Sequence, residues 1–235
     1  MNNWDKQIVD GTVAADPAEA STEALSWSEY LARGCEHLRS DNIFAPLIAR
    51  YDPPGERRAG DLYTDLIDAI VSQQLSVKAA AAIMRRFLDL FPDRKPSPEA
   101  VRSVSTDVLR GVGLSRAKVR YLHGIADAVI GGNIKLTAAA RLENEAFIAE
   151  LTRLKGVGRW TAEMLLIFSL GRRDVFSVGD LGLRTAVARL YAVDRDDSEA
   201  IVSIADTWRP FRSLACHFLW KSLDNTPQLA TERSE

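Results

Sequence analysis

The sequence predicts an all-α fold, and three observations support that prediction. From Trp27 onward, almost every segment spaces its apolar residues with the period of a helix. No segment shows the convincing alternation of apolar and polar residues that a half-buried strand would have. Several expected helix starts also carry capping chemistry, such as Ser97 before Pro98, and Ser76 before the alanine-rich run VKAAAAIMRRF.

The segments between the two ends of the chain read as a succession of helices joined by short turns. We predict helices at residues 27–39, 42–50, 61–74, 76–91, 98–104, 106–110, 115–131, 143–153, 159–170, 181–192, 197–207 and 210–223. Their ends are predicted to within about 2–4 residues. Residues 1–26 have no sustained apolar period, so we expect a mobile acidic tail there, and a second tail at 225–235. The stretch DPPGERRAG, at 52–60, is typical of a connector.

The composition is that of an ordinary soluble globular protein, with 46% hydrophobic and 26% charged residues in a chain of 235. No run approaches the roughly 18 apolar residues that a membrane helix needs, and the N-terminus lacks a signal pattern. We therefore expect an intracellular protein with no membrane partner. The two cysteines, Cys35 and Cys216, are expected to be buried. Two thiolates cannot supply the four that a standard iron–sulfur cluster needs, so we expect no such cluster.

The charge distribution is compatible with nucleic acid binding but does not demand it. The whole chain has a net charge of −2. Residues 1–26 carry −4 and residues 224–235 carry −2, which leaves +4 on residues 27–223. A mildly basic core between acidic tails permits contact with DNA.

The segment LKGVGRWTAE, at residues 154–163, stands between two predicted helices. Gly156 and Gly158 lack a Cβ, so the second helix begins with free N–H groups beside a bare backbone, which suits a phosphate oxygen. Taken alone, GxG is better explained as a turn between helices with glycine at the helix C-cap. The apolar Val157 between the glycines and Thr161 after them complete the pattern LxGVGxxTA. That pattern resembles the helix–hairpin–helix motif, which binds a DNA phosphate without reading the base sequence.

The resemblance extends along most of the chain. Twenty residues after Trp160 comes Asp180, in DVFSVGDLGLR, at the start of the next predicted helix. With IVSQQLSVKAA at 70–80 and the later WRPFRSLACHFLW, this order resembles the helix–hairpin–helix (HhH-GPD) DNA glycosylase superfamily. Within it, the sequence is most similar to the 3-methyladenine DNA glycosylase II branch. The similarity spans roughly residues 41–223.

This resemblance implies two helical lobes with the active site in the cleft between them. Residues 27–63 with 173–224 are expected to form the first lobe, and residues 64–172 the second, which would carry the wedge and the hairpin. The chain has no room for the larger N-terminal α/β domain of the familiar bacterial enzyme, so it resembles a compact form.

The resemblance also implies a monofunctional hydrolase of base excision repair. Such an enzyme flips an alkylated purine, for example 3-methyladenine or 7-methylguanine, out of duplex DNA, cuts its N-glycosidic bond and leaves an abasic site. Asp180 matches the catalytic aspartate, which stabilises positive charge on the sugar; its alternative role is an ordinary helix cap. Relatives that also nick DNA carry a lysine directly after GxGR. Trp160 stands there instead, and the nearby Lys155 precedes the glycines, so we expect no lyase activity.

Three residues are candidates for the base pocket. The face of Trp160 would attract an electron-poor alkylated base by stacking and cation–π effects. Trp220 matches a pocket tryptophan of the family, and Met164 takes the place of an aromatic residue. For Trp220 and Met164, plain core packing is an equal alternative.

A flipped base leaves a gap that a wedge side chain fills. Gln74 matches the wedge position, with Leu75 and Ser76 beside it, and either Gln74 or Leu75 is the inserted residue. The alternative is that Gln73 and Gln74 are simply solvated residues at a helix end.

Residue matching also assigns DNA-backbone and cation contacts. The phosphate would be held by the backbone N–H groups of Gly156 and Gly158 and by the side chain of Thr161. A structural Na⁺ or K⁺ would be held by the carbonyls of Thr152, Leu154 and Val157. No histidine has metal-ligand spacing, so we expect no catalytic metal. We also expect no catalytic cofactor. The stretch LRGVGLSRAKVRYL, at 109–122, echoes the hairpin, and its Arg116 and Lys118 are candidate DNA contacts or an ordinary solvated face.

Two other function classes stay open. One is a non-enzymatic DNA-binding or damage-sensing protein, against which the retained Asp180 counts. The other is a glycosylase for another lesion, such as ethenoadenine, hypoxanthine or uracil. In each case the partner is double-stranded DNA and we expect a monomer, in the cytoplasm with the nucleoid if bacterial or in the nucleus if eukaryotic.

Overall fold

The computed structural model describes residues 22, 24–56 and 60–223. Over these residues the chain is helical and contains no strand, which confirms the predicted all-α class. The predicted C-terminal tail, residues 1–21 and 23 of the predicted N-terminal tail, and residues 57–59 of the connector lie outside the described residues. In the described part of the N-terminal tail, the carbonyls of Thr22 and Leu25 accept from Arg173, and Ser26 caps α2. The helices are α2 (Trp27–Arg39), α3 (Ala45–Arg50), α4 (Leu62–Ser72), α5 (Val77–Leu88), η1 (Pro92–Arg94), α6 (Pro98–Ser103), α7 (Thr106–Gly111), α8 (Arg116–Ile130), α9 (Leu136–Ala139), α10 (Asn144–Leu151), α11 (Arg159–Phe168), α12 (Leu181–Tyr191), α13 (Ser198–Asp206) and α14 (Arg212–Ser222).

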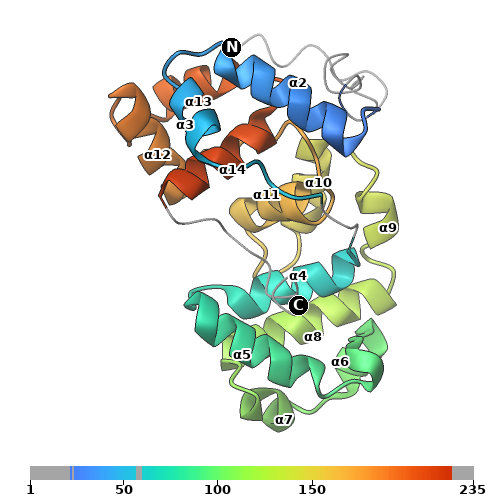
Figure 1. Ribbon diagram of the computed structural model, residues 1–235. Helices are drawn as coiled ribbons and strands as arrows, with labels where there is room; N and C mark the ends of the chain where they lie inside the picture. Colours follow the sequence, from blue (N-terminus) through green and yellow to red (C-terminus); the bar gives the residue numbers. More distant parts are fainter. Residues whose placement is uncertain (1–21, 23, 57–59, 224–235) are drawn as a thin grey trace, which may run out of the picture.

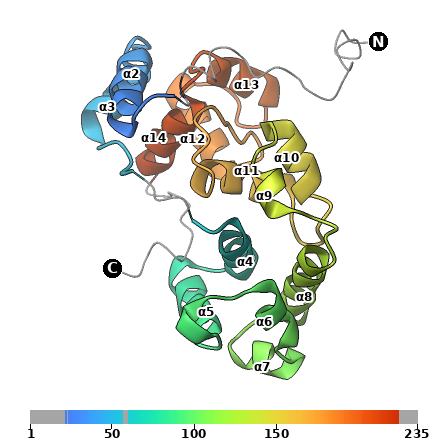
Figure 2. The same ribbon diagram turned by 90° about the vertical axis from the view of Figure 1, so that its right-hand side faces the viewer.

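The helices gather into an upper and a lower group (Figure 1). Helices α4 to α8 form the lower group, in which α8 packs on α4, α6 and α7. Helices α2, α3, α12, α13 and α14 form the upper group, where α14 contacts α2, α3 and α12. From α2 onward, the chain thus runs from the upper group to the lower one and returns through α9, α10 and α11 (Figure 2). The lobe boundaries at residues 64 and 172 stay predictions.

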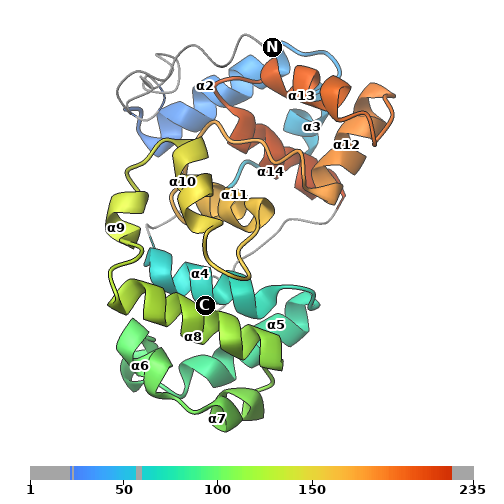
Figure 3. The same cartoon turned by 180° about the vertical axis from the view of Figure 1, so that it is seen from behind.

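Helices α10 and α11 lie between the two groups, as the view from behind also shows (Figure 3). Helix α11 contacts α10 and α4, so it connects the hairpin with the lower group. Its residues 161–168 are all buried. This central position places the first turn of α11 close to elements from both groups.

Local chemistry explains where the observed helix bounds differ from the predicted ones. Helix α3 begins at Ala45 rather than near residue 42, because the Asp41 carboxylate accepts from the N–H groups of Ile43 and Phe44 and forms a turn first. Helix α5 ends at Leu88, and the chain is extended at Phe91, as expected directly before a proline. The short helices η1 and α9 were not predicted, because three or four residues are too few to show a period.

Aromatic side chains fill the core of the upper group. Trp208 is 1% exposed and its ring centroid lies 5.2 Å from that of Phe44 and 5.8 Å from that of Phe176. Cys35 and Cys216 are both buried and free, as the sequence predicted. Among the described residues, no helix has the length and apolar character that crossing a membrane requires.

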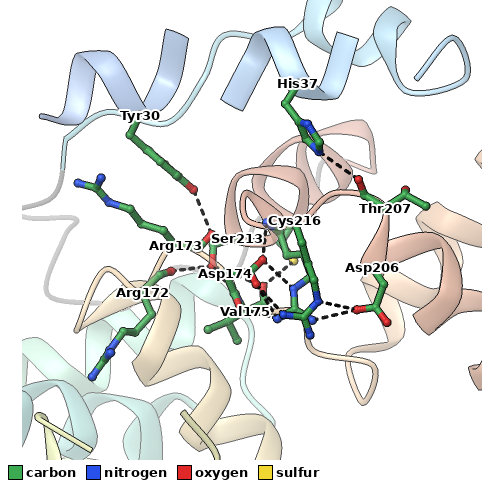
Figure 4. Close-up of polar contacts among 12 residues, drawn as sticks. Tyr30, His37, Arg172, Arg173, Asp174, Val175, Asp206, Thr207, Ser213 and Cys216 are labelled. Carbon is green, nitrogen blue, oxygen red and sulfur yellow. Dashed lines mark hydrogen bonds and ion pairs between the residues drawn. The ribbon is translucent and has the colours of Figure 1, made fainter. Parts of the chain in front are cut away.

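A polar network holds the segment after α11 against α14, as Figure 4 shows. The buried Asp174 carboxylate pairs with Arg209 at 3.0 Å and with Arg212 at 2.7 Å. The Ser213 hydroxyl accepts from the N–H of Val175 at 3.0 Å. Because these partners lie on α14 and just before it, they fix the path of the chain toward residue 180.

Candidate active site

Asp180 begins helix α12 and is fixed by it. Its backbone is extended, and its Oδ1 accepts a 2.8 Å hydrogen bond from the N–H of Leu183, so it is a helix N-cap as the sequence predicted. The residue is only 7% exposed. A buried carboxylate needs hydrogen-bond donors, so its other partners decide what it can do.

Two indole groups supply those donors. Trp160, on α11, donates from Nε1 to Oδ2 of Asp180 at 2.7 Å. Trp220, on α14, donates from Nε1 to Oδ1 at 3.1 Å. Oδ1 thus accepts two hydrogen bonds and Oδ2 accepts one from the described residues, which leaves more acceptor capacity on Oδ2. Donors from three helices therefore orient this carboxylate, and Oδ2 keeps more unused acceptor capacity than Oδ1.

The two tryptophans differ in their access to solvent. Trp160 is 41% exposed, whereas Trp220 is fully buried and stacks on Phe168 with ring centroids 5.4 Å apart. Met164 is also buried, one helical turn after Trp160. The structure therefore brings Trp160 and Trp220 together at Asp180. Of the three candidates, Trp160 alone is exposed to solvent, and the pocket roles of all three stay predictions.

A second buried carboxylate, that of Glu163 on α11, contacts the loop before Asp180. Arg159 donates to its Oε1 at 2.8 Å, and the Ser177 hydroxyl donates to its Oε2. Burial raises the pKa of Glu163, and the hydrogen bond from Ser177 and the charge of Arg159 oppose that rise. The backbone carbonyl of Ser177 in turn accepts a hydrogen bond from the N–H of Asp180 at 3.0 Å, so Glu163 connects α11 to the loop that carries Asp180.

Glu163 was not among the site residues predicted from the sequence, although it ends the segment LKGVGRWTAE. Its spacing from Arg159 is four residues, which is the distance of an ion pair along one helix face. That spacing could have predicted the ion pair between Arg159 and Glu163. Its burial and its contact with Ser177 depend on the fold and could not be read from the spacing.

The hairpin lies between α10 and α11 as predicted. Gly156 has a φ of +95°, and an added Cβ would lie 2.5 Å from Cδ2 of Tyr121, so both conformation and space require glycine. Gly158 is the N-cap of α11 with no side-chain cap, and nothing lies within 4 Å of where its Cβ would be. The start of α11 therefore presents a bare backbone to open space, the geometry that suits an oxygen anion.

The other residues assigned to the hairpin have these positions. Thr161 is 3% exposed, and its hydroxyl is within 3.4 Å of Nε2 of Gln73. The Leu154 carbonyl accepts from the N–H of Val157 at 3.1 Å, and the Thr152 hydroxyl donates to the carbonyl of Ile148 at 2.8 Å. Within the described residues there is no cluster of three or more His, Cys, Asp or Glu side chains that could hold a metal ion. The phosphate and cation roles of the hairpin stay predictions.

The turn between α4 and α5 holds the predicted wedge residues. Gln74 has a φ of +57°, Leu75 is 37% exposed, and Ser76 caps α5 by accepting from the N–H of Ala79. Gln73 is not a solvated helix-end residue, because its side chain donates to the carbonyl of Gly156 at 2.9 Å.

Lys118 was predicted to face DNA or solvent, but its ammonium group contacts the protein backbone. Its ammonium group donates to the carbonyls of Val71 and Gln73, each at 2.7 Å, and it is therefore occupied inside the protein. It is neither a free DNA contact nor part of a solvated face.

Comparison with known proteins gives one consistent result. The family described as HhH-GPD superfamily base excision DNA repair protein matches residues 67–210. The DNA-3-methyladenine glycosylase 1 of Schizosaccharomyces pombe is 38% identical over 179 residues, which cover 75% of this chain and 78% of that protein.

Solved structures agree with this result. A Schizosaccharomyces pombe 3-methyladenine DNA glycosylase in complex with abasic DNA has a TM-score of 0.74 and 36% identity, with 82% of this chain and 97% of that chain covered. A DNA-3-methyladenine glycosidase from Bacillus halodurans has a TM-score of 0.69 and 34% identity, with 79% and 86% covered. The chain is thus similar over most of its length to proteins of one fold.

Proposed function

Because the chain belongs to the HhH-GPD superfamily of base excision DNA repair proteins, we propose that it is a monofunctional DNA glycosylase for alkylated purines. It takes duplex DNA, flips out a base such as 3-methyladenine or 7-methylguanine, and hydrolyses the N-glycosidic bond. The observation that carries this proposal is the Asp180 carboxylate, which is held by two indole N–H groups and a helix N-terminus.

The chemistry follows from that carboxylate. When the bond between base and sugar breaks, positive charge develops on the sugar, and a fixed carboxylate stabilises it. The donors from Trp160 and Trp220 hold Asp180 in one orientation, so little reorganisation is needed at the moment of reaction. Oδ2 has the capacity to accept one more hydrogen bond, which suits a water molecule that then attacks the sugar.

Trp160 supports the assignment as a hydrolase without lyase activity. A lyase needs an amine that forms a Schiff base with the sugar. Trp160 has an indole there, and its N–H is already engaged by Asp180. Water is then the nucleophile, and the product is an abasic site in an uncut strand.

The exposed ring of Trp160 is the proposed recognition surface for the base. Alkylation of a purine ring nitrogen leaves a cationic ring, and an aromatic face attracts a cation by about 0.5–2 kcal/mol. Trp220 and Met164 lie deeper and are proposed to close the pocket behind it. A preference for cationic purines over neutral ones follows from this stacking.

The backbone at Gly156 and Gly158 is proposed to grip a DNA phosphate, together with Thr161. The open space at Gly158 supports this role. The carbonyls of Thr152, Leu154 and Val157 are hard oxygen donors from one turn, the type that Na⁺ or K⁺ accepts, so the donor set fits a structural cation there. The turn at Gln74, Leu75 and Ser76 is proposed to fill the gap left by the flipped base.

Since the substrate is DNA, the protein is proposed to act where DNA is held, with the nucleoid in a bacterium or in the nucleus of a eukaryote. We propose that it acts as a monomer.

Base release from methylated duplex DNA tests the proposal. Wild type is expected to release 3-methyladenine, and Asp180→Asn to release it at least a hundredfold more slowly, a loss typical of removing a charge-stabilising group. Asparagine is also a good N-cap, so the fold should persist. Asp197→Asn is the matched control, because Asp197 caps α13 in the same way.

The same assay separates the alternatives. A lesion panel with ethenoadenine, hypoxanthine and uracil is expected to show slower release than from methylated purines. Binding of abasic duplex without release from any substrate would instead indicate a damage sensor. Wild-type release by Asp180→Asn would contradict the mechanism.

A further inference from the structure

Two side chains from distant parts of the sequence hold the turn between α4 and α5. Gln73 is the C-cap of α4, and its side chain reaches the hairpin 83 residues away. Lys118, in the first turn of α8, reaches the backbone of the same turn across 45 residues. The hairpin and wedge roles proposed above assign no function to either residue.

Lys118 closes the end of helix α4. The last carbonyls of a helix lack partners within it and carry the negative end of the helix dipole. The ammonium of Lys118 donates to the carbonyls of Val71 and Gln73, both at 2.7 Å, and so satisfies two of these groups. Partial burial lowers the pKa of Lys118. Its contacts hold the backbone directly before Gln74.

Gln73 connects this turn to the hairpin. Its Nε2 donates to the carbonyl of Gly156 at 2.9 Å and to the hydroxyl of Thr161 at 3.4 Å. A carbonyl only accepts, so the amide nitrogen must face Gly156. Because the Thr161 oxygen accepts from Gln73, its own hydrogen remains available to donate elsewhere. One amide thus contacts both the glycine turn and the first turn of α11.

Helix α8 contacts both the turn between α4 and α5 and the hairpin. Tyr121 follows Lys118 by one helical turn, and its ring is the group that an added Cβ at Gly156 would meet first. One face of α8 therefore supports the turn through Lys118 and the hairpin through Tyr121. Helix α8 therefore contacts both the turn and the hairpin, and it sets the distance between them.

We propose that Gln73 and Lys118 are positioning residues that make phosphate binding at the hairpin and insertion of the Gln74–Ser76 turn into DNA a single event. This inference rests on the proposed function, since it needs a flipped base. Bound phosphate fixes the Gly156 backbone. The hydrogen bond from Gln73 to the Gly156 carbonyl then fixes the position of the adjoining Gln74–Ser76 turn. Without the connection, the hairpin still grips DNA but the wedge is no longer held in register with the gap.

The test uses Gln73→Met, which keeps the length of the side chain and removes the donor. The first probe is duplex DNA with 2-aminopurine opposite an abasic site, whose fluorescence rises when the wedge disturbs stacking there. We expect affinity for undamaged duplex to change less than about twofold. The fluorescence response and the single-turnover rate of base release should fall about three- to tenfold, the range of a lost hydrogen bond.

A second substrate separates positioning from plain structural damage. In a duplex with the alkylated base in an unpaired bulge, the base is already extruded and no wedge is needed. Gln73→Met is expected to release that base at nearly the wild-type rate. An equal loss of rate on paired and bulged substrates would mean that the whole site is distorted, and would overturn the proposal, as would no loss on either.

Variants of Lys118 and a second variant of Gln73 test the same connection independently. Lys118→Met should repeat the pattern of Gln73→Met, with Lys135→Met as the control for loss of an exposed positive charge. If Gln73→Met fails to fold, Gln73→Glu replaces the donor with a carboxylate of the same length and is tested in the same way. If wild type releases no base from any substrate, the proposed function fails. The fluorescence measurement still tests the connection in that case.

Discussion

The indole Nε1 of Trp160 lies 2.7 Å from Oδ2 of Asp180 and donates a hydrogen bond to it. Trp160 is also 41% exposed, whereas the second indole at this carboxylate, that of Trp220, is fully buried. One side chain therefore donates to the proposed catalytic group and is also exposed to solvent, where we propose that its ring meets the substrate. Stacking and orientation can be separated by substitution, because phenylalanine keeps a ring and loses the donor.

Trp160→Phe is expected to lower the single-turnover rate of base release about tenfold or more, while affinity for abasic DNA stays close to that of wild type. A hydrogen bond to a charged group contributes about 1.5–3 kcal/mol, and Oδ2 loses its only donor among the described residues. Trp27→Phe is the control, since Nε1 of Trp27 is buried with no hydrogen-bond partner in the described chain. An unchanged rate in Trp160→Phe would show that the indole N–H has no orienting role.

Alanine at the two hairpin glycines is expected to have different effects. Gly156→Ala forces a side chain into a φ of +95° and against Tyr121, so we expect a loss of about 1–3 kcal/mol in the free energy of unfolding. Gly158→Ala meets open space and should leave stability nearly unchanged. Its methyl group would stand where the phosphate is proposed to approach, so duplex affinity should fall. Urea unfolding and fluorescence anisotropy measure both quantities, and full affinity in Gly158→Ala would contradict the phosphate grip.

The sequence predicted the parts of this site that depend on local pattern. The glycine turn, the cap at Asp180 and the tryptophan after GxGR could be recognised because each is defined by its neighbours in the chain. Gln73 and Lys118 could not, since their partners lie 83 and 45 residues away and neither has a distinguishing local context. The short helices α9 and η1 were not predicted because a single helical turn is too short to show a period of apolar residues.

The buried Glu163 predicts a pH dependence of stability. Burial raises its pKa above the ordinary value of 4.5, so the folded state holds the proton more tightly than the unfolded state. Its contribution to stability is therefore fully present below pH 4.5 and is lost as pH rises through the folded-state pKa. Arg159 and Ser177 oppose this loss, whereas the charge of Glu145 adds to it.

We expect wild type to lose stability relative to Glu163→Gln as pH rises from about 4 to about 7, since glutamine does not titrate. Urea unfolding of both proteins across that range measures the difference, in which other titrating groups cancel. A difference that grows in favour of wild type with rising pH would mean that the pairing with Arg159 outweighs burial.

Replacing the indole by an amine tests the placement of Trp160 beside the sugar. In Trp160→Lys, the new amine would start from the backbone position that now brings a side chain to Asp180. It can attack C1′ of an abasic sugar, lose water and form a Schiff base, which borohydride reduces to a stable protein–DNA link. We expect trapped complex from Trp160→Lys and none from wild type, whose own hairpin lysine, Lys155, is the internal control. Trapping by wild type would contradict the monofunctional assignment. If Trp160→Lys binds abasic duplex yet gives no trapped complex, residue 160 does not bring an amine to C1′, which contradicts its proposed place beside the sugar.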